Sequence, residues 1–240
     1  MQLPLHLLIS EKLREQISSG VFQPGAQLPS EHQLMSEFAV SRITVRRAIS
    51  NLVNQGLVVP QRGKGVFVKE QRKVTYSLSS PLVFFEEDMA RQGVVSSIEN
   101  LIFKAIPAPP ETEQALRLDS GQNEVYLQKK LLLIDGVPVA IDSTHILPHL
   151  GRTFAAELKS QMTFPVLEKN GVAIEQITAT LECTHADYET SEFLNVPLGG
   201  PLLVYCYTAY THDDQPVLCG RCFSRGDRLT YSVVLTKRSR

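Results

Sequence analysis

The chain has 240 residues, of which 43% are hydrophobic and 20% are charged. This composition suits one or two folded domains and excludes an extended disordered protein. No stretch approaches the ~18 uninterrupted apolar residues of a membrane helix, and charges interrupt the apolar pattern of residues 1–15, unlike in a signal peptide. Four cysteines are too few for a disulfide scaffold, so we expect a cytoplasmic protein without a membrane partner.

Charge is distributed unevenly along the chain. Residues 1–73 contain ten Lys and Arg against five Asp and Glu, whereas the remaining residues contain fourteen against twenty. A small basic module joined to a larger acidic one indicates that only the first module meets a polyanion. Chance variation of surface charge is the alternative interpretation of this difference.

Three helices are expected in the basic module. Apolar residues recur with helical spacing over residues 4–20. A second helix should follow Ser30, which forms a capping-box pattern with Gln33. A third helix is expected over residues 42–55, with Ser41 as its N-cap and a basic outer face.

A small β-ribbon should follow these helices. Residues 57–60 and 66–68 have the pattern of short strands, and the segment between them is a basic, glycine-bearing hairpin. Three helices followed by such a ribbon predict a winged helix-turn-helix in residues 1–70. The polar and serine-rich residues 71–80 are expected to form a linker.

The acidic module, residues 81–240, alternates long strand patterns with shorter helical ones. The expected helices cover about 82–92, 110–118, 152–160 and 187–195. The expected strands cover 97–106, 124–134, 137–147, 174–185, 202–212, 217–224 and 229–236. An antiparallel sheet with helices packed on it is the natural arrangement, so the fold class is α+β.

The third helix carries the strongest candidates for DNA contact. Arg42 and Arg46 lie one turn apart near its start, where a guanidinium can pair with the O6 and N7 of guanine. Thr44 and Ser41 offer hydroxyls, and the helix N-termini at Ser30 and Ser41 offer free N–H groups for phosphate. The plainer alternative is that the arginines, Arg47 included, form an ordinary solvated helix face.

The hairpin supplies a second basic element. Arg62 and Lys64 could reach the minor groove or its flanking phosphates. Gly63 and Gly65 would allow the backbone to approach the DNA closely.

Three motifs in this module, over residues 24–31, 40–46 and 63–68, resemble the DNA-binding head of the GntR family. The resemblance implies DNA contacts at Arg42, Thr44, Arg46 and Gly63. One departure concerns the arginine that many members have two residues after the serine of the Pro-Ser pair. Here Ser30 is that serine, and His32 occupies the arginine position. A histidine there would weaken or alter one contact.

Residues 80–240 resemble the UTRA effector-binding domain of the HutC subfamily, whose fold is akin to chorismate lyase. The supporting segments are residues 130–138, 142–148 and 225–228. The resemblance implies a small-molecule effector and no cofactor. Related members respond to phosphorylated sugars, amino-acid catabolites or phosphonates, so we expect an anion, a sugar or an amino-acid catabolite.

The resemblance also implies an effector site with two basic residues, acidic residues and a hydroxyl. Lys130, Asp142 and Thr163 match a basic, an acidic and a hydroxyl position. The second basic position falls on Leu132 and a late acidic position on Leu218, so the pocket has less charge than a sugar-phosphate site. Two further candidates for an anion are Arg221 and Arg225. The plainer alternative is that all these residues are surface or strand-pairing residues.

Competing functions have weaker support. Cys219 and Cys222 invite a metal or redox interpretation, but residues three apart on a strand point to opposite faces, so we expect no metal site. A lyase-like enzyme would need catalytic motifs, and the sequence has no nucleophile elbow, phosphate-binding loop or metal-binding His-Glu pair. A nonspecific architectural DNA protein would leave the acidic module without a role. The resemblance to the GntR head and the UTRA domain therefore implies a repressor that a metabolite releases from DNA.

We also expect a homodimer held by the second module. One recognition helix in one groove reads too few base pairs, and two-fold symmetry doubles the site. The operator should therefore be an inverted repeat in double-stranded DNA.

Overall fold

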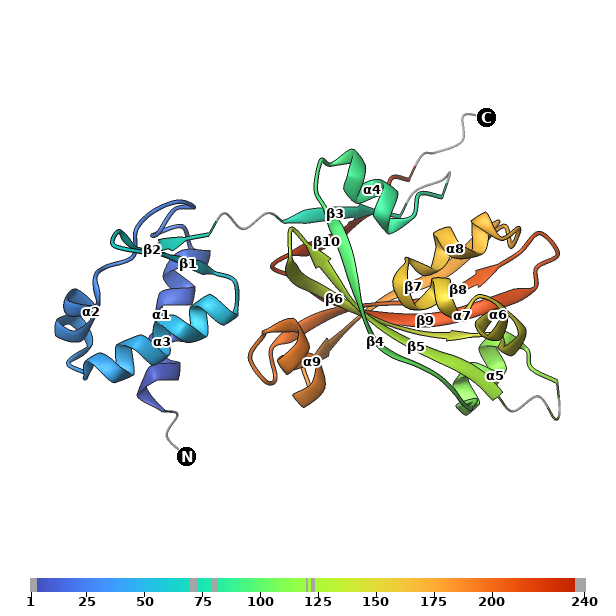
Figure 1. Ribbon diagram of the computed structural model, residues 1–240, viewed down its shortest axis with the longest axis horizontal. Helices are drawn as coiled ribbons and strands as arrows, with labels where there is room; N and C mark the ends of the chain where they lie inside the picture. The colour runs from blue at the N-terminus through green and yellow to red at the C-terminus, as the bar shows by residue number, and fades with distance from the viewer. Residues whose placement is uncertain (1–3, 70–72, 79–81, 120, 122–123, 236–240) are drawn as a thin grey trace. The chain divides into compact units, whose positions relative to one another are not determined.

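The computed structural model describes residues 4–69, 73–78, 82–119, 121 and 124–235. The chain divides into two compact units, residues 1–72 and residues 73–240 (Figure 1). Each unit has its own buried apolar cluster, and each is described by itself below.

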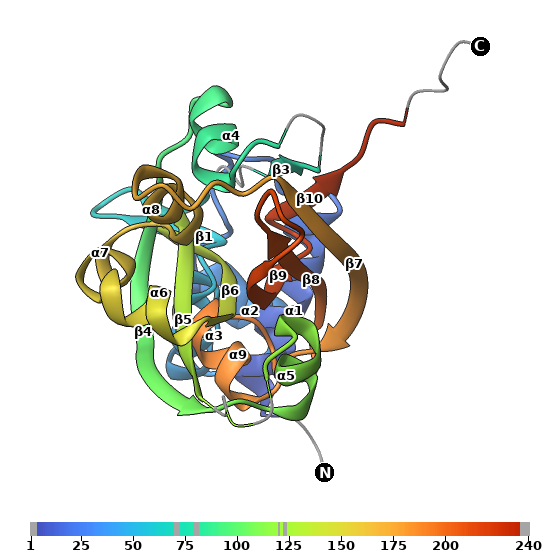
Figure 2. The same ribbon diagram turned by 90° about the vertical axis from the view of Figure 1, so that its right-hand side faces the viewer.

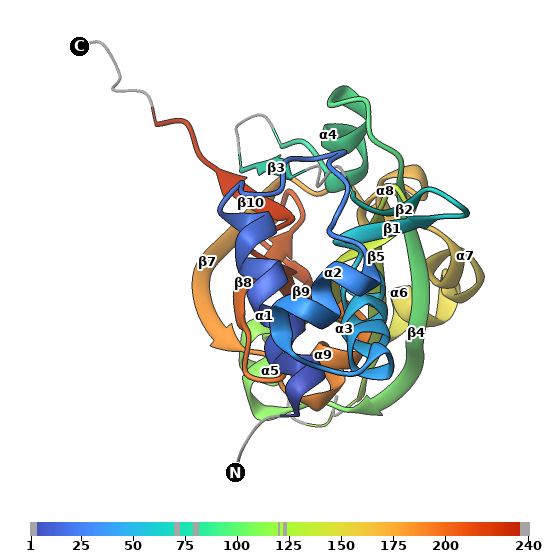
Figure 3. The ribbon, with the colours of Figure 1, turned by 90° about the vertical axis from the view of Figure 1, so that its left-hand side faces the viewer.

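Unit 1 is a three-helix module followed by a β-hairpin, as Figure 3 shows. Its elements are α1 (Leu5–Ser18), α2 (Glu31–Phe38), α3 (Arg42–Asn54), β1 (Val58–Gln61) and β2 (Gly65–Val68). The two strands pair antiparallel. Apolar residues from all three helices and from the hairpin form one core, including Leu13, Leu34, Val45 and Leu52. The expected winged helix-turn-helix is confirmed.

Unit 2 is built on a six-stranded antiparallel sheet with the order β4-β5-β6-β9-β8-β7 (Figure 2). The strands are β4 (Ser96–Pro107), β5 (Glu124–Ile134), β6 (Val137–Ile146), β7 (Gln176–His185), β8 (Pro201–Tyr210) and β9 (Pro216–Arg225). The β5–β6 turn uses Asp135 and Gly136, both with positive φ, as a two-residue hairpin requires. The predicted α+β class is confirmed.

Helices cover both faces of this sheet. They are α4 (Phe85–Arg91), α5 (Pro110–Leu116), α6 (Pro148–Thr153), α7 (Ala155–Ser160), α8 (Thr163–Lys169) and α9 (Tyr188–Leu194). Helices α4, α7 and α8 bury apolar residues in the same cluster as Leu132 and Tyr205. Leu194 of α9 packs with Leu131, the strand neighbour of Leu132. Because side chains alternate along a strand, α9 lies on the opposite face from α8.

The expected linker differs from the structure at residues 74–77. These residues form β3 (Val74–Ser77), which pairs in parallel with β10 (Leu229–Ser232) outside the six-stranded sheet. The Ser77 backbone N–H also donates to Asp88 Oδ2 at 2.7 Å. Residues 71, 72, 79 and 80 of the expected linker lie outside the described residues.

Three other expectations also need correction. The helix expected over residues 152–160 is two short helices, α6 and α7. The last strand ends at Ser232, four residues earlier than expected. Helix α8 was not expected, because its seven residues are too few to show a helical apolar period.

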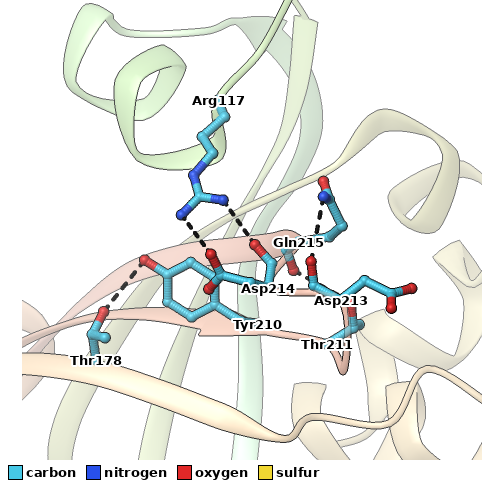
Figure 4. A network of polar contacts seen from close by, with 7 residues as sticks. All are labelled: Arg117, Thr178, Tyr210, Thr211, Asp213, Asp214 and Gln215. Carbon is cyan, nitrogen blue, oxygen red and sulfur yellow. Dashed lines mark hydrogen bonds and ion pairs between the residues drawn. The ribbon is translucent and has the colours of Figure 1, made fainter.

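An arginine at the end of α5 secures the turn between β8 and β9 (Figure 4). Arg117 Nη1 donates to the Asp214 carbonyl at 2.8 Å, and Nη2 donates to Asp214 Oδ2 at 3.1 Å. The guanidinium carbon of Arg117 lies 5.7 Å from the centre of the Tyr210 ring. These exposed contacts join the end of α5 to the β8–β9 turn.

Candidate DNA interface and effector pocket

Helices α2 and α3 each begin at a serine whose side chain caps the helix. Ser30 Oγ accepts from the Gln33 backbone N–H at 3.3 Å and donates to Gln33 Oε1 at 2.8 Å, and the Ser30 N–H also donates to Gln33 Oε1, so the expected capping box is confirmed. Ser41 Oγ accepts from the Thr44 backbone N–H and lies 2.9 Å from the Thr44 hydroxyl. Because these bonds occupy both serine hydroxyls, the two serines fix where the helices start.

The first turns of α3 carry two exposed arginines. The side chains of Arg42 and Arg46 are 65% and 71% exposed. The Nε atom of each lies 3.7 Å from a different carboxylate oxygen of Glu31, at the start of α2. Exposed ion pairs of this kind contribute only ~0–1 kcal/mol, so DNA can replace Glu31 at little cost. Both guanidinium groups can then pair with guanine edges.

The other candidates on these two helices differ in exposure. His32 and Arg47 are exposed, whereas Thr44 is half-buried and shares its hydroxyl with Ser41. Val45, on the inner side of α3, is fully buried. The basic side chains therefore lie on the solvent side of the helix, where the sequence predicted them.

The β1–β2 hairpin has the geometry of a wing. Gly63 and Gly65 have φ values of +73° and +120°, which glycine adopts far more readily than other residues. Gln27 Nε2 donates to the Lys64 carbonyl at 2.7 Å, and a Cβ on Gly65 would overlap the Gln27 amide. Arg62 and Lys64 are exposed at the tip. Gln27 is a supporting residue that the sequence analysis missed.

In unit 2, three of the predicted effector residues come together at one cavity. Lys130 is only 1% exposed, and its Nζ donates to the Gln161 carbonyl at 2.6 Å and to Thr163 Oγ1 at 2.9 Å. Thr163 in turn donates to Gln128 Oε1 at 2.6 Å. Burial lowers the pKa of Lys130 to about 8, and the charge of Asp142 acts against this shift.

Asp142 is the third of these residues and pairs with Lys130 in the β5–β6 register. Its Oδ1 accepts from the Tyr207 hydroxyl at 2.9 Å, and its Oδ2 accepts from the Thr144 hydroxyl at 2.7 Å. Burial raises the pKa of Asp142, while these two hydrogen bonds and the charge of Lys130 act to lower it. The pocket therefore holds two opposite ionisable groups on neighbouring strands.

Aromatic side chains form most of the remaining wall. The rings that line the cavity include those of Tyr76, Phe84, Phe164, Tyr205, Tyr207 and Tyr231. Phe84 and Phe164 stack with their ring centroids 4.9 Å apart, although they come from the N-termini of different helices. The sequence did not predict this wall. The alternation of Tyr205 and Tyr207 on β8 was the available signal that two rings share one sheet face.

Arg221 and Arg225 do not line this cavity, so their assignment to it is corrected. Arg221 lines a hollow on the opposite sheet face, and its Nη2 lies 3.6 Å from Glu182 Oε2. Arg225 is 3% exposed and donates to the Leu194 carbonyl and to both carboxylate oxygens of Asp227. Because side chains alternate along β9, Arg221 points away from the cavity. The guanidinium of Arg225 is already occupied by buried hydrogen bonds.

The cysteines behind the metal or redox interpretation, Cys219 and Cys222, lie on opposite faces of the sheet. All four cysteines of the chain are free. Cys219 lines the hollow on one sheet face and Cys222 lines the aromatic cavity on the other, as expected for residues three apart on a strand. Burial raises the pKa of Cys219 to about 11 and that of Cys222 to about 12, so both are poor nucleophiles at neutral pH. No group of three His, Cys, Asp or Glu among the described residues could hold a metal ion.

Comparison with protein families assigns both units. Residues 6–68 match the family of bacterial regulatory proteins named gntR, and residues 91–230 match the UTRA domain. Within the described ranges, no helix has both the length and the apolar character needed to cross a membrane.

Similar proteins extend over nearly the whole chain. The HTH-type transcriptional repressor NagR of Bacillus subtilis is 31% identical over 231 residues, which cover 95% of this chain and 93% of that protein. The mannosyl-D-glycerate transport/metabolism system repressor MngR of Escherichia coli is 28% identical over 237 residues, 98% of each chain. The crystal structure of PhnF from Mycobacterium smegmatis shares the fold, with a TM-score of 0.64, 23% identity and coverage of 95% and 99%. This chain therefore belongs to the GntR family of bacterial regulatory proteins and has the two domains of its HutC subfamily.

Proposed function

We propose that this protein is a cytoplasmic repressor that binds an inverted-repeat operator as a homodimer. A small molecule bound between Lys130 and Asp142 releases it from DNA. The observation that carries the proposal is the exposed pair of Arg42 and Arg46 at the start of α3. Two similar proteins, NagR and MngR, are named as repressors, which supports negative regulation.

Each part of the DNA interface has its own role in this proposal. Arg42 and Arg46 contact base edges in the major groove, and Thr44 supports them from the same helix turn. Arg47, His32 and the free N–H groups at the two helix N-termini contact phosphates. At the wing, Arg62, Gly63 and Lys64 contact the minor groove or its flanking phosphates.

Selection of bound sequences from a random DNA library tests the proposal. We expect an inverted repeat whose half-sites lie about one helical turn apart. At matched salt, the selected operator should bind at least ~10³-fold more tightly than unrelated DNA. Equal affinity for both would instead indicate a nonspecific architectural protein.

Replacing Lys64 with alanine should weaken binding to all DNA sequences by a similar factor. A phosphate contact carries no sequence information, so only the electrostatic contribution is lost. The magnitude of the slope of log affinity against log salt concentration should fall by about one, because one phosphate contact is lost. Titrations of the operator and of unrelated DNA at several salt concentrations measure both effects. A loss confined to the operator would place Lys64 on a base instead.

The free edge of the sheet in unit 2 supports dimerisation. Strand β7 is the last strand of the sheet, and eight of its ten residues are exposed. It has no proline or lysine, the residues that commonly protect an edge from pairing, and Leu181 is 53% exposed. We propose that two copies pair β7 to β7 around a two-fold axis, which forms one continuous antiparallel sheet.

Replacing Leu181 with lysine should convert the dimer to a monomer. The lysine places two like charges near the proposed axis and removes apolar area from it. Sedimentation at micromolar concentration measures the change, and Leu198→Lys serves as control because Leu198 is also exposed, at 69%, but lies in the turn before β8. A monomeric parent protein, or a dimer that survives Leu181→Lys, would contradict the β7 assignment.

Membership of a regulator family supports binding of the effector without chemical change. The full-length protein incubated with an effector should return it unaltered. Conversion of the effector to a product would favour the lyase-like alternative.

A further inference from the structure

The ionisable groups of the effector cavity indicate what kind of molecule it accepts. Among the described residues that line it, Lys130 is the one cation, and Asp142 and Glu86 are the carboxylates. Glu86 is exposed on α4, whereas Lys130 and Asp142 are register partners on β5 and β6. The cavity therefore presents one basic and one acidic group side by side.

Both groups retain capacity for a ligand. An ammonium has three donors, and Lys130 uses two of them on Gln161 and Thr163. A carboxylate has about four acceptor sites, and Asp142 receives hydrogen bonds from two hydroxyls, those of Tyr207 and Thr144. A ligand could donate a hydrogen bond to Asp142 and accept one from Lys130. It would use their remaining hydrogen-bonding capacity without displacing a protein contact.

The aromatic wall suits the positive end of such a ligand. Tyr205 and Tyr231 stack with their ring centroids 5.4 Å apart, and the Tyr76 ring lies 6.4 Å from that of Tyr205. An ammonium beside such rings gains a cation–π attraction that increases when water is excluded. These rings line the same cavity as Asp142.

The charge balance of the cavity disfavours a phosphorylated sugar. Its phosphate would bring about −1.5 to −2 charges beside a carboxylate, and Lys130 is the single cation among the described lining residues to balance them.

We infer that the effector is a small zwitterion, an amino acid or close derivative, whose carboxylate accepts from Lys130 and whose ammonium donates to Asp142. This inference rests on the proposed function of the pocket. The stacked rings of Phe84 and Phe164 cover the bound molecule.

Thermal-shift and calorimetric titrations of the full-length protein test the inference, because a ligand of the folded state raises its stability. The probes are the protein amino acids, glucose 6-phosphate and two analogues of each amino acid that binds. One analogue is the amide, which lacks the carboxylate, and the other is the hydroxy acid, which lacks the ammonium. Each analogue should bind about tenfold or more weakly, because a charge-assisted hydrogen bond is lost.

Two variants assign the two ends of the ligand. Lys130→Met removes the partner of the ligand carboxylate, so it should abolish the preference for the amino acid over its amide. Asp142→Asn removes the partner of the ligand ammonium, so it should abolish the preference for the amino acid over the hydroxy acid. Lys104→Met, at an exposed lysine on β4, should change neither preference. If either pocket variant fails to fold, the analogue comparison on the parent protein still decides.

The inference is overturned if no amino acid binds at millimolar concentration, if the analogues bind as tightly as the amino acid, or if glucose 6-phosphate binds more tightly. Release of operator DNA is measured separately. If a phosphorylated sugar binds the protein and releases it from operator DNA, the proposal of a zwitterionic effector is overturned. The proposal that the protein is a repressor then remains. Failure of every bound compound to alter operator affinity would overturn the proposed switch.

Discussion

Replacing Arg46 with alanine should lower affinity for the selected operator by about 1–3 kcal/mol, or about 5- to 150-fold. The Arg46 side chain is 71% exposed, and its Nε atom lies 3.7 Å from Glu31. This weak ion pair competes little with a contact to a guanine edge. Loss of a bidentate base contact lowers both the affinity for the operator and the discrimination between base pairs at that position. The variant should therefore bind operators changed at one base pair of each half-site almost as well as the parent operator.

Fluorescence anisotropy with the operator, the changed operators and unrelated DNA at one salt concentration measures this effect. Lys64→Ala is the matched comparison, since it also removes one positive charge but from the wing. Thermal unfolding should be unchanged, because Arg46 contributes nothing to the buried core. Full operator affinity in Arg46→Ala would show that Arg46 does not contact the bases and that the assigned face of α3 is wrong.

Replacing Tyr76 with alanine should leave operator binding intact and abolish release by the effector. Tyr76 lies on β3, the first described element of unit 2, and its ring lines the effector cavity. It contacts Phe85 and Tyr231 with ring centroids 5.6 and 6.1 Å apart. An effector that moves this ring moves the strand that follows the DNA-binding unit.

The magnitude follows from linkage. An effector changes DNA affinity only through its different affinities for the two states of the protein, and a coupling of about 1–3 kcal/mol gives about 5- to 150-fold release. Without the Tyr76 ring, that factor should be lost even at saturating effector. In a cell, the result is persistent repression.

Operator titrations with and without saturating effector measure the coupling, and calorimetry confirms that the effector still binds. Tyr76→Phe is the control, since it retains the ring and should retain release. Normal release from Tyr76→Ala would show that β3 does not carry the signal.

Some features of the DNA-binding unit follow from the sequence because they depend on near neighbours. The Ser30–Gln33 capping box and the Ser41 cap are formed within one helical turn. Gly63 adopts a positive φ in a short hairpin, which glycine favours for a local steric reason. The support of the wing was not predictable in this way, because Gln27 reaches Lys64 across 37 residues.

The effector site shows the same division. Lys130 and Asp142 could be proposed as neighbours from the sequence, since a two-residue turn fixes the register of β5 and β6. Tyr76 could not be placed, because four residues carry no independent strand signal and β3 exists through its pairing with the distant β10. Arg221 and Arg225 were candidates for the effector site only because their side chains are basic.

The sequence by itself determined the helix caps, the hairpin turns and the basic face of α3, since each depends on local sterics or periodicity. Only the tertiary structure decided which side chains share the effector cavity. That cavity is lined by β3, β5, β6, β8, β9, β10 and the starts of α4 and α8. Its residues are distant in sequence, and burial of their aromatic surface in one core brings them together.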